Sequence, residues 1–313
     1  MTFGERVFLY CERGSSEALF AEPINAVSNA AFLLAALAGF LLVLRRPPEE
    51  RNADQFLLPV LVLFIGLGSL AFHLYANRGT ALADVVPISL FMLVYFGFAL
   101  NRFLGVPPAW TTLAVLGFTA IVAITMQVRC GEDFIGFPGS GVEGVKPCLN
   151  GSLFYFPALV ALMVVGLILS ERGHKAAPWL LWAAAIFALS IALRSLDLAL
   201  CDKAVFEGRK VGTHFAWHVL NALALFLLLR ASLEGGPGSV TRSETIPVVF
   251  ETLEPRAGAP VVFVPAEDAP APEPLAERVA SASEAEAESA TEAEAEETEA
   301  PDKEGERKPF FPT

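Results

Sequence analysis

Three of the four histidines in this 313-residue chain lie inside strongly apolar segments. His73 follows Ser69 by four residues, and His218 follows His214 by the same spacing. Side chains four residues apart share one face of a helix. Ionisable groups at membrane depth are costly and usually mark a functional site. Three imidazoles that leave one position open are also the ligand set of a catalytic zinc ion. The pattern therefore predicts a zinc site inside a membrane protein.

An aspartate stands at the start of the next apolar run. Asp84 follows His73 after a short loop, so the two apolar segments must pack side by side and place these residues at one depth. A carboxylate there can take a proton from an attacking water and hand it to a leaving amine. The Ser69 hydroxyl could stabilise the developing oxyanion or hold the water. The predicted chemistry is hydrolysis of a carbonyl compound, and a site within the bilayer implies a lipid substrate.

Each of these residues has a simpler interpretation when taken alone. Two membrane histidines can hydrogen-bond to neighbouring helices, and Ser69 can bond back to its own helix. Asp84 can be a first-turn acid that the helix dipole favours. The common depth of all these residues favours the metal site. His174, in a charged loop at the opposite end, is expected to be solvated and not a ligand.

The composition is that of a membrane protein, because 54% of the residues are hydrophobic. A hydrocarbon core about 30 Å thick requires roughly 20 apolar residues per helix. Seven segments satisfy this: 24–45, 54–76, 80–102, 109–128, 152–171, 177–200 and 212–232. The sequence therefore predicts an all-α membrane protein, a seven-transmembrane helix bundle.

The net charge of −12 belongs to the C-terminal part of the chain. Residues 231–313 hold 19 acidic and 6 basic residues, whereas the first 230 residues hold 15 acidic and 16 basic ones. The C-terminal part has few large apolar residues and cannot offset its chain entropy. We expect an extramembrane N-terminal segment (1–23), a transmembrane hydrolase domain (24–232) and a disordered acidic cytoplasmic tail (233–313). The tail's partners are unknown, and no nucleic acid is expected to bind.

All four cysteines are predicted on the side of the membrane that carries the N-terminus. An even set on one side suggests two disulfides and an oxidising compartment. The expected pairs are Cys130–Cys148 and Cys11–Cys201, and four unlinked thiols are the alternative.

Loop charges bear on the orientation. Three arginines in the first loop suit the cytoplasm, although the last loop carries three basic residues on the opposite side. We expect an exoplasmic or periplasmic N-terminus and a cytoplasmic C-terminus. The Ala, Gly, Pro and Arg usage hints at a GC-rich bacterium and hence at a bacterial cytoplasmic membrane.

Two further groups of charged residues have candidate roles. Glu12, Glu17 and Glu22, with nearby carbonyls and Asn25, form an oxygen-rich set that could hold Ca²⁺, although acidic surface loops are common. Arg194 and Asp197, three residues apart, are expected to form a buried neutralising pair. Asp197 could instead orient a ligand histidine.

Together these residues resemble the alkaline ceramidases. More broadly they resemble the CREST superfamily of seven-transmembrane hydrolases, which is related to the adiponectin and progestin receptors. The resemblance covers residues 7–232. It is carried by Ser69-x3-His73, by Asp84 after the short loop, by THFAWH in the last span, and by the segments FLYCERG, AEPINAVSN and RSLDLALC.

The resemblance implies roles for particular residues. It assigns Zn²⁺ to His73, His214 and His218, catalysis to Ser69 and Asp84, and a disulfide to Cys11 and Cys201. The calcium site of the animal enzymes would map onto Glu12, Glu22 and the carbonyl of Tyr10. Here the chain departs from the family, with Leu9 in place of an aspartate and Tyr10 in place of a tryptophan. The loop between the fourth and fifth spans also looks enlarged and could cap the site.

The expected activity is zinc-dependent cleavage of the N-acyl bond of ceramide or a related lipid amide, a reaction of sphingolipid metabolism that yields a fatty acid and a sphingoid base. One alternative is a hydrolase of another acyl lipid. Another is a receptor-like membrane protein with a structural zinc ion. Asp84 and Ser69 favour the enzyme, because a structural zinc ion needs neither residue.

Overall fold

The computed structural model describes residues 2–131, 135–137 and 146–235. Seven segments are long and apolar enough to cross a membrane: Pro23–Leu44, Ala53–Tyr75, Arg78–Phe103, Pro108–Gln127, Cys148–Glu171, Ala177–Leu196 and His214–Ala231. They match the seven predicted spans to within four residues at every end. The chain is therefore a multi-pass membrane protein built as a seven-helix bundle. The predicted disordered tail lies outside the described residues after position 235.

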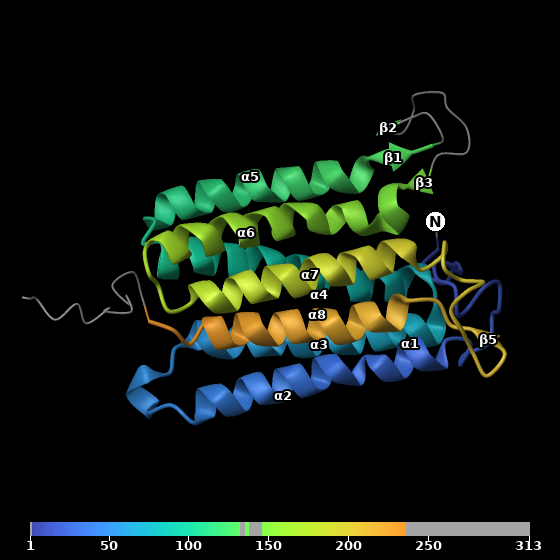
Figure 1. Ribbon diagram of the computed structural model, residues 1–313, viewed down its shortest axis with the longest axis horizontal. Coiled ribbons are helices and arrows are strands. Elements are labelled where there is room, and N and C mark those ends of the chain that lie inside the picture. The colour runs from blue at the N-terminus through green and yellow to red at the C-terminus, as the bar shows by residue number, and fades with distance from the viewer. Residues whose placement is uncertain (1, 132–134, 138–145, 236–313) are drawn as a thin grey trace, which may run out of the picture. The chain divides into compact units, whose positions relative to one another are not determined.

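The helices lie side by side with their long axes in roughly the same direction (Figure 1). The first span contains α1 (Pro23–Ser28) and α2 (Ala30–Leu44). After the short turn η1 (Pro48–Glu50) come α3 (Ala53–Tyr75), α4 (Arg78–Phe98) with its π-helical end η2 (Ala99–Phe103), and α5 (Pro108–Gln127). The chain continues through η3 (Cys148–Tyr155), α6 (Phe156–Glu171), α7 (Ala177–Leu196) and α8 (His214–Ala231).

Short strands occur only at one end of the described bundle. The strands β2 (Ile135–Gly136), β1 (Arg129–Cys130) and β3 (Lys146–Pro147) form an antiparallel sheet in that order. In the last loop, β4 (Val205–Phe206) pairs with β5 (Arg209–Lys210). The proposed cap over the site falls largely on residues of the loop outside the described part.

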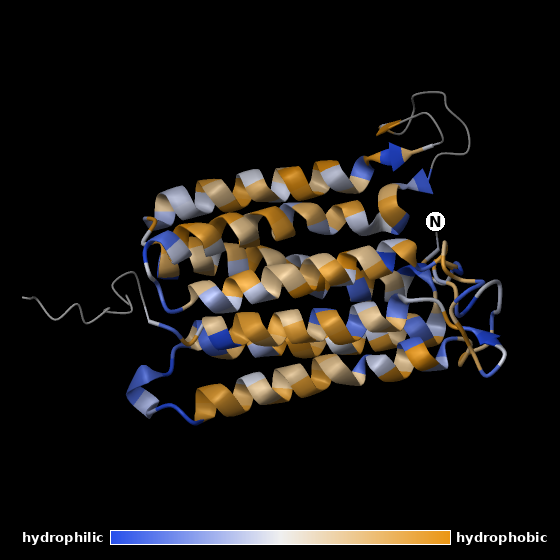
Figure 2. Ribbon diagram, viewed as in Figure 1, coloured by the Kyte–Doolittle hydropathy of each residue, from blue (hydrophilic) through white to orange (hydrophobic). Residues whose placement is uncertain are grey.

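The helices are apolar on their outer as well as their inner faces. Inside, Phe32, Leu58 and Val62 belong to one buried cluster, whereas Leu34 and Phe64 are exposed. A helix that is hydrophobic all round fits a hydrocarbon environment. Figure 2 shows these apolar helices, with the hydrophilic residues gathered mainly at the two ends.

The packing brings α3 beside α4 and α8. The helix α3 packs on α2 and α4, and α8 packs on α2 and α7. Ala76, in the left-handed conformation, ends α3, and the Asn77 side chain accepts a hydrogen bond from the Thr80 backbone to begin α4. This tight connection sets the end of α3 level with the start of α4, as the short loop predicted.

All four cysteines lie at the end of the bundle where α3 ends and α8 begins. Cys11 is bonded to Cys201, and Cys130 is bonded to Cys148. These are the two predicted pairs, and no free cysteine is found in the described residues. The first bond ties the N-terminal segment to the loop that precedes α8, close to the predicted metal ligands.

Candidate metal centre

The three membrane histidines meet in one buried cluster. His73 comes from the last turn of α3, and His214 and His218 come from the first two turns of α8. One ligand atom from each ring lies within 4.8 Å of the others. Within the described part of the chain, no other group of three or more His, Cys, Asp or Glu side chains meets this condition.

The partner of His73 fixes which ring nitrogen carries a lone pair. Its Nδ1 lies 2.6 Å from Glu22 Oε2. A carboxylate can only accept a hydrogen bond, so Nδ1 carries the proton and the neutral ring presents an unprotonated Nε2. Glu22 is held in turn by Arg13 at 2.5 Å and by the Asn25 amide at 3.1 Å.

His218 is fixed in the same way by a hydroxyl group. Its Nδ1 lies 2.7 Å from Ser28 Oγ, and the Ser28 hydroxyl donates to the Asn25 carbonyl. Ser28 therefore accepts a hydrogen bond from Nδ1–H of His218. The Nε2 atom of His218 is then unprotonated and carries a lone pair.

These assignments bring two lone pairs face to face. Nε2 of His73 and Nε2 of His218 are 3.1 Å apart, an arrangement that only a shared cation, a metal ion or a proton, makes favourable. His214 adds a third imidazole, whose buried Nδ1 has no hydrogen-bond partner among the described residues. Three imidazoles of this kind fit Zn²⁺.

His214 is positioned by residues from two other segments. The Tyr10 ring stacks on its imidazole with centroids 3.6 Å apart. The buried Asp197 carboxylate accepts the backbone N–H groups of Thr213 and His214 at 2.8 and 2.9 Å, and that of Cys11 at 2.8 Å. Burial raises the pKa of Asp197 more than these three donors lower it. Asp197 thus anchors both the start of α8 and the N-terminal segment.

The expected ion pair between Arg194 and Asp197 is wrong. Arg194 donates instead to the Ser152 hydroxyl, to the Asn150 carbonyl and to the Tyr10 hydroxyl. The two side chains diverge because α7 ends at Leu196, which leaves Asp197 in the following turn. The other predicted role of Asp197, to orient a ligand histidine, agrees better with the structure, because Asp197 positions His214 by accepting its backbone N–H.

The two predicted catalytic residues lie beside the cluster. Ser69 Oγ is 3.5 Å from Nε2 of His218. The half-buried Asp84 is hydrogen-bonded to Ser69 and lies near His73. The structure therefore brings together all five residues that the sequence singled out.

The N-terminal segment closes this end through Arg13. The buried guanidinium donates to the carbonyls of His73 and Leu74 at the end of α3 and to that of Ala18 in its own segment. A cation is favourable there, because the last carbonyls of a helix carry partial negative charge. Burial acts to raise the pKa of Glu22, but His73 and Arg13 outweigh it and hold the pKa below its usual value.

The acids proposed for calcium have other partners. Glu12 accepts the backbone N–H groups of Ile24 and Asn25, both at 2.8 Å, and its pKa is raised by burial despite these bonds. Glu22 serves His73, and Glu17 is exposed. The Tyr10 carbonyl, which the calcium hypothesis used, accepts the Gly14 backbone N–H at 3.4 Å, and the Tyr10 ring is buried. This arrangement gives the calcium hypothesis no support.

The expectation that His174 is solvated is wrong. Its side chain is buried at the opposite end of the bundle, against the Phe103 ring, and its Nδ1 accepts the Ala176 backbone N–H. The loop folds into a turn that covers it. It remains outside the histidine cluster, as predicted.

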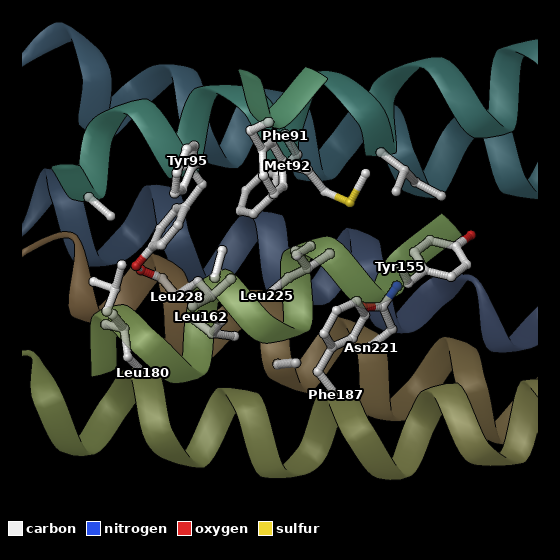
Figure 3. A pocket seen from close by; sticks show the side chains of 18 of the residues that line it. Phe91, Met92, Tyr95, Tyr155, Leu162, Leu180, Phe187, Asn221, Leu225 and Leu228 are labelled. Atoms are coloured by element: carbon white, nitrogen blue, oxygen red, sulfur yellow. The ribbon is translucent and has the colours of Figure 1, made fainter. Parts of the chain in front are cut away.

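An apolar cavity runs between α4, α6, α7 and α8. Tyr155 and Asn221 lie toward one end of it, and Tyr95, Leu180 and Leu228 toward the other (Figure 3). Asn221 follows His218 by three residues on α8. The cavity therefore begins within one helical turn of the cluster, and its lining suits a hydrocarbon chain.

A seven-helix bundle with three buried histidines, a serine and an aspartate at one end defines a membrane-embedded protein with a candidate metal centre. A family model described as Ceramidase matches residues 9–233. The chain belongs to the ceramidase family, and the resemblance predicted from the sequence is confirmed. No curated protein matches the chain.

Proposed function

We propose that the protein is a zinc-dependent intramembrane amidohydrolase that cleaves the N-acyl bond of ceramide or a related lipid amide. The products are a fatty acid and a sphingoid base. Membership of the ceramidase family supports amide hydrolysis. The observation that carries the zinc proposal is the pair of Nε2 atoms of His73 and His218, which face each other at 3.1 Å beside a third imidazole.

The three histidines would hold the zinc ion, and Glu22 and Ser28 would keep two of the rings in the required orientation. When bound, zinc polarises a carbonyl group and lowers the pKa of a coordinated water to about 7.

Asp84 carries the proton in the proposed mechanism. It accepts a proton from water as the water oxygen bonds to the amide carbon. It then gives that proton to the amine nitrogen as the C–N bond breaks. Ser69, hydrogen-bonded to Asp84, lies 3.5 Å from His218 Nε2 and can hold the water or the oxyanion between these groups.

The apolar cavity supports a long-chain substrate. Its lining comes from several spans and contains one amide, that of Asn221, among mainly aliphatic and aromatic side chains. We assign this cavity to the acyl chain, whose carbonyl end would then lie next to the cluster. A lipid can enter such a site from the bilayer.

We also propose that the cluster lies on the exoplasmic or periplasmic side, with the acidic tail in the cytoplasm. Both disulfides lie at the same end of the bundle as the cluster. Disulfides persist in oxidising compartments. A bacterial cytoplasmic membrane is the proposed location.

The test incubates the purified full-length protein with acyl-labelled ceramide. We expect fatty-acid release from the wild type and none from His214→Ala, which loses a metal ligand. Asp84→Asn should keep its zinc and lose at least about 100-fold in kcat, the usual scale of general acid–base catalysis. Asp202→Asn, which removes an exposed acid from the last loop, is the control.

Three outcomes would redirect the proposal. Equal release from wild type and His214→Ala contradicts the zinc mechanism. Release from other acyl lipids but not from ceramide assigns a different substrate. Zinc binding without release from any lipid favours the receptor-like alternative.

A further inference from the structure

A second cavity lies at the same end of the bundle as the histidine cluster. Side chains from the end of α5, from η3 and from α7 line it. Two arginines, Arg129 and Arg194, are among the lining residues, and no acidic residue from the described part of the chain lines this cavity. The described lining therefore carries positive charge.

Arg194 is the buried cation of this cavity. Its side chain is 8% exposed. Among the described residues, the guanidinium donates only to neutral oxygens, those of Asn150 at 2.6 Å, Ser152 at 3.0 Å and Tyr10 at 3.1 Å. Its Nε is buried and has no partner among the described residues.

The charge of Arg194 also lacks an ion-pair partner in the described part of the chain. Asp197, three residues further on, is occupied by backbone N–H groups. Asp84 acts on Arg194 electrostatically but forms no ion pair with it. A buried charge without a counterion is costly, so an anionic ligand is the natural partner for this site.

The second cavity adjoins the reaction centre. Tyr155 lines both cavities, and the Arg194 guanidinium lies 5.3 Å from the centre of its ring. Val85, next to Asp84, also lines the second cavity. An amide held at Asp84 with its acyl chain in the first cavity can therefore place its amine-side portion in the second.

We propose that the second cavity binds an anionic group, a carboxylate or a phosphate, on the amine side of the substrate, and that Arg194 is its main contact. This inference rests on the proposed function and adds a preference, among the lipid amides proposed there, for those with an anionic group on the amine side. A planar guanidinium with an unused N–H suits both anions, because their oxygens accept charge-assisted hydrogen bonds.

The first experiment compares substrates that differ only in charge or nearly so. N-palmitoylglycine is paired with N-palmitoylethanolamine, and ceramide 1-phosphate is paired with ceramide. We expect the full-length wild type to have a kcat/KM about tenfold or more higher for the anionic member of at least one pair, the scale of a hydrogen bond to a charged group.

Variants of Arg194 test whether this residue causes the preference for the anionic substrate. Arg194→Met should abolish it by lowering the kcat/KM of the anionic substrate, and Arg194→Lys should restore part of it. Arg172→Met removes an exposed arginine at the opposite end of the bundle and is the matched control. Equal kcat/KM values within both wild-type pairs would refute the proposal, whether or not the Arg194 variants fold.

A binding measurement separates this inference from the proposed function. The full-length protein is titrated with dodecyl phosphate and with dodecanol, and intrinsic tryptophan fluorescence is followed. We expect the phosphate to bind at least about tenfold more tightly, and Arg194→Met to remove the difference. Binding of this kind without hydrolysis of any amide would overturn the hydrolase and leave the anion site standing. Hydrolysis of neutral amides, with dodecyl phosphate and dodecanol binding equally tightly, would overturn the anion site and leave the hydrolase standing. Inorganic phosphate that binds as tightly as dodecyl phosphate would overturn the assignment of a lipid ligand.

Discussion

Each histidine ring of the cluster is held by a different neighbour. Glu22 accepts from His73, Ser28 accepts from His218, and Tyr10 stacks on His214. Such partners fix which nitrogen faces the metal, and their loss commonly weakens metal binding. The affinity of the cluster for zinc should therefore depend on residues that are not themselves ligands.

We predict that Glu22→Gln weakens zinc binding about 10- to 100-fold, because the amide is a poorer acceptor for His73 Nδ1–H and leaves Arg13 without its counterion. The measurement is zinc retained against increasing concentrations of a chelator. Glu17→Gln, in the same segment but exposed, should behave as the wild type. Equal retention in all three proteins would show that Glu22 does not support the site.

The sequence predicted the five central residues but not how they are supported. His73, His214 and His218 stand out because imidazoles are rare in apolar helices. Glu22 and Arg13 lie in a charged loop, where such residues are ordinary, and Glu22 is 51 positions from the histidine it contacts. Only folding of the loop onto α3 reveals their roles. The Ser28 hydroxyl, a polar group within the first apolar span, was a signal that could have been used.

At the scale of the helices, one glycine sets the distance between α3 and α4. A Cβ on Gly68 would overlap the backbone of Ala83, the residue before Asp84. Gly68 also precedes Ser69, so this close approach of the two helices coincides with the contact between the two predicted catalytic residues. The backbone contact at this point holds Asp84 in reach of the cluster.

We expect Gly68→Ala to push α4 away, because backbone cannot yield as a flexible side chain does. The fold should lose about 1–3 kcal/mol, a typical cost of overpacking, and hydrolysis should fall by more than zinc content does. Thermal unfolding, zinc analysis and the rate of fatty-acid release measure these effects. Gly117→Ala on α5 is the control, since nothing lies within 4 Å of its added Cβ. Similar rates in both variants would contradict the role given to this contact.

The helices themselves were predictable because long apolar runs have few other solutions in a chain of this composition. Their ends were less so. The sixth span was expected to reach residue 200 but α7 ends at Leu196, and the residues after it form the turn that places Asp197 against the start of α8. Hydropathy cannot show that end, since LDLAL continues the apolar pattern.

At the scale of the whole molecule, the N-terminal segment is part of the site. The Cys11–Cys201 disulfide holds it against the last loop, and the Cys11 backbone N–H donates to Asp197. Its neighbour Tyr10 covers His214, and Arg13 binds the end of α3. The segment therefore covers the cluster at this end of the bundle.

Replacing Cys11 and Cys201 together by serine should lower stability by about 2–4 kcal/mol and speed the loss of zinc to a chelator, because Tyr10 and Asp197 lose a covalent support. Replacing Cys130 and Cys148 should leave the zinc loss unchanged. The rates of zinc release, followed with a chromogenic chelator, decide the matter. Equal rates for the two double variants would contradict the closing role of the N-terminal segment.

The central claim is that zinc bound by the three histidines drives hydrolysis of a lipid amide. The most direct test measures fatty-acid release by the wild type as purified, after zinc removal and after zinc is added back, with bound zinc quantified in each sample. We predict that the rate falls with the zinc content and returns with it, at one ion per chain. A full rate in zinc-free protein would contradict the account.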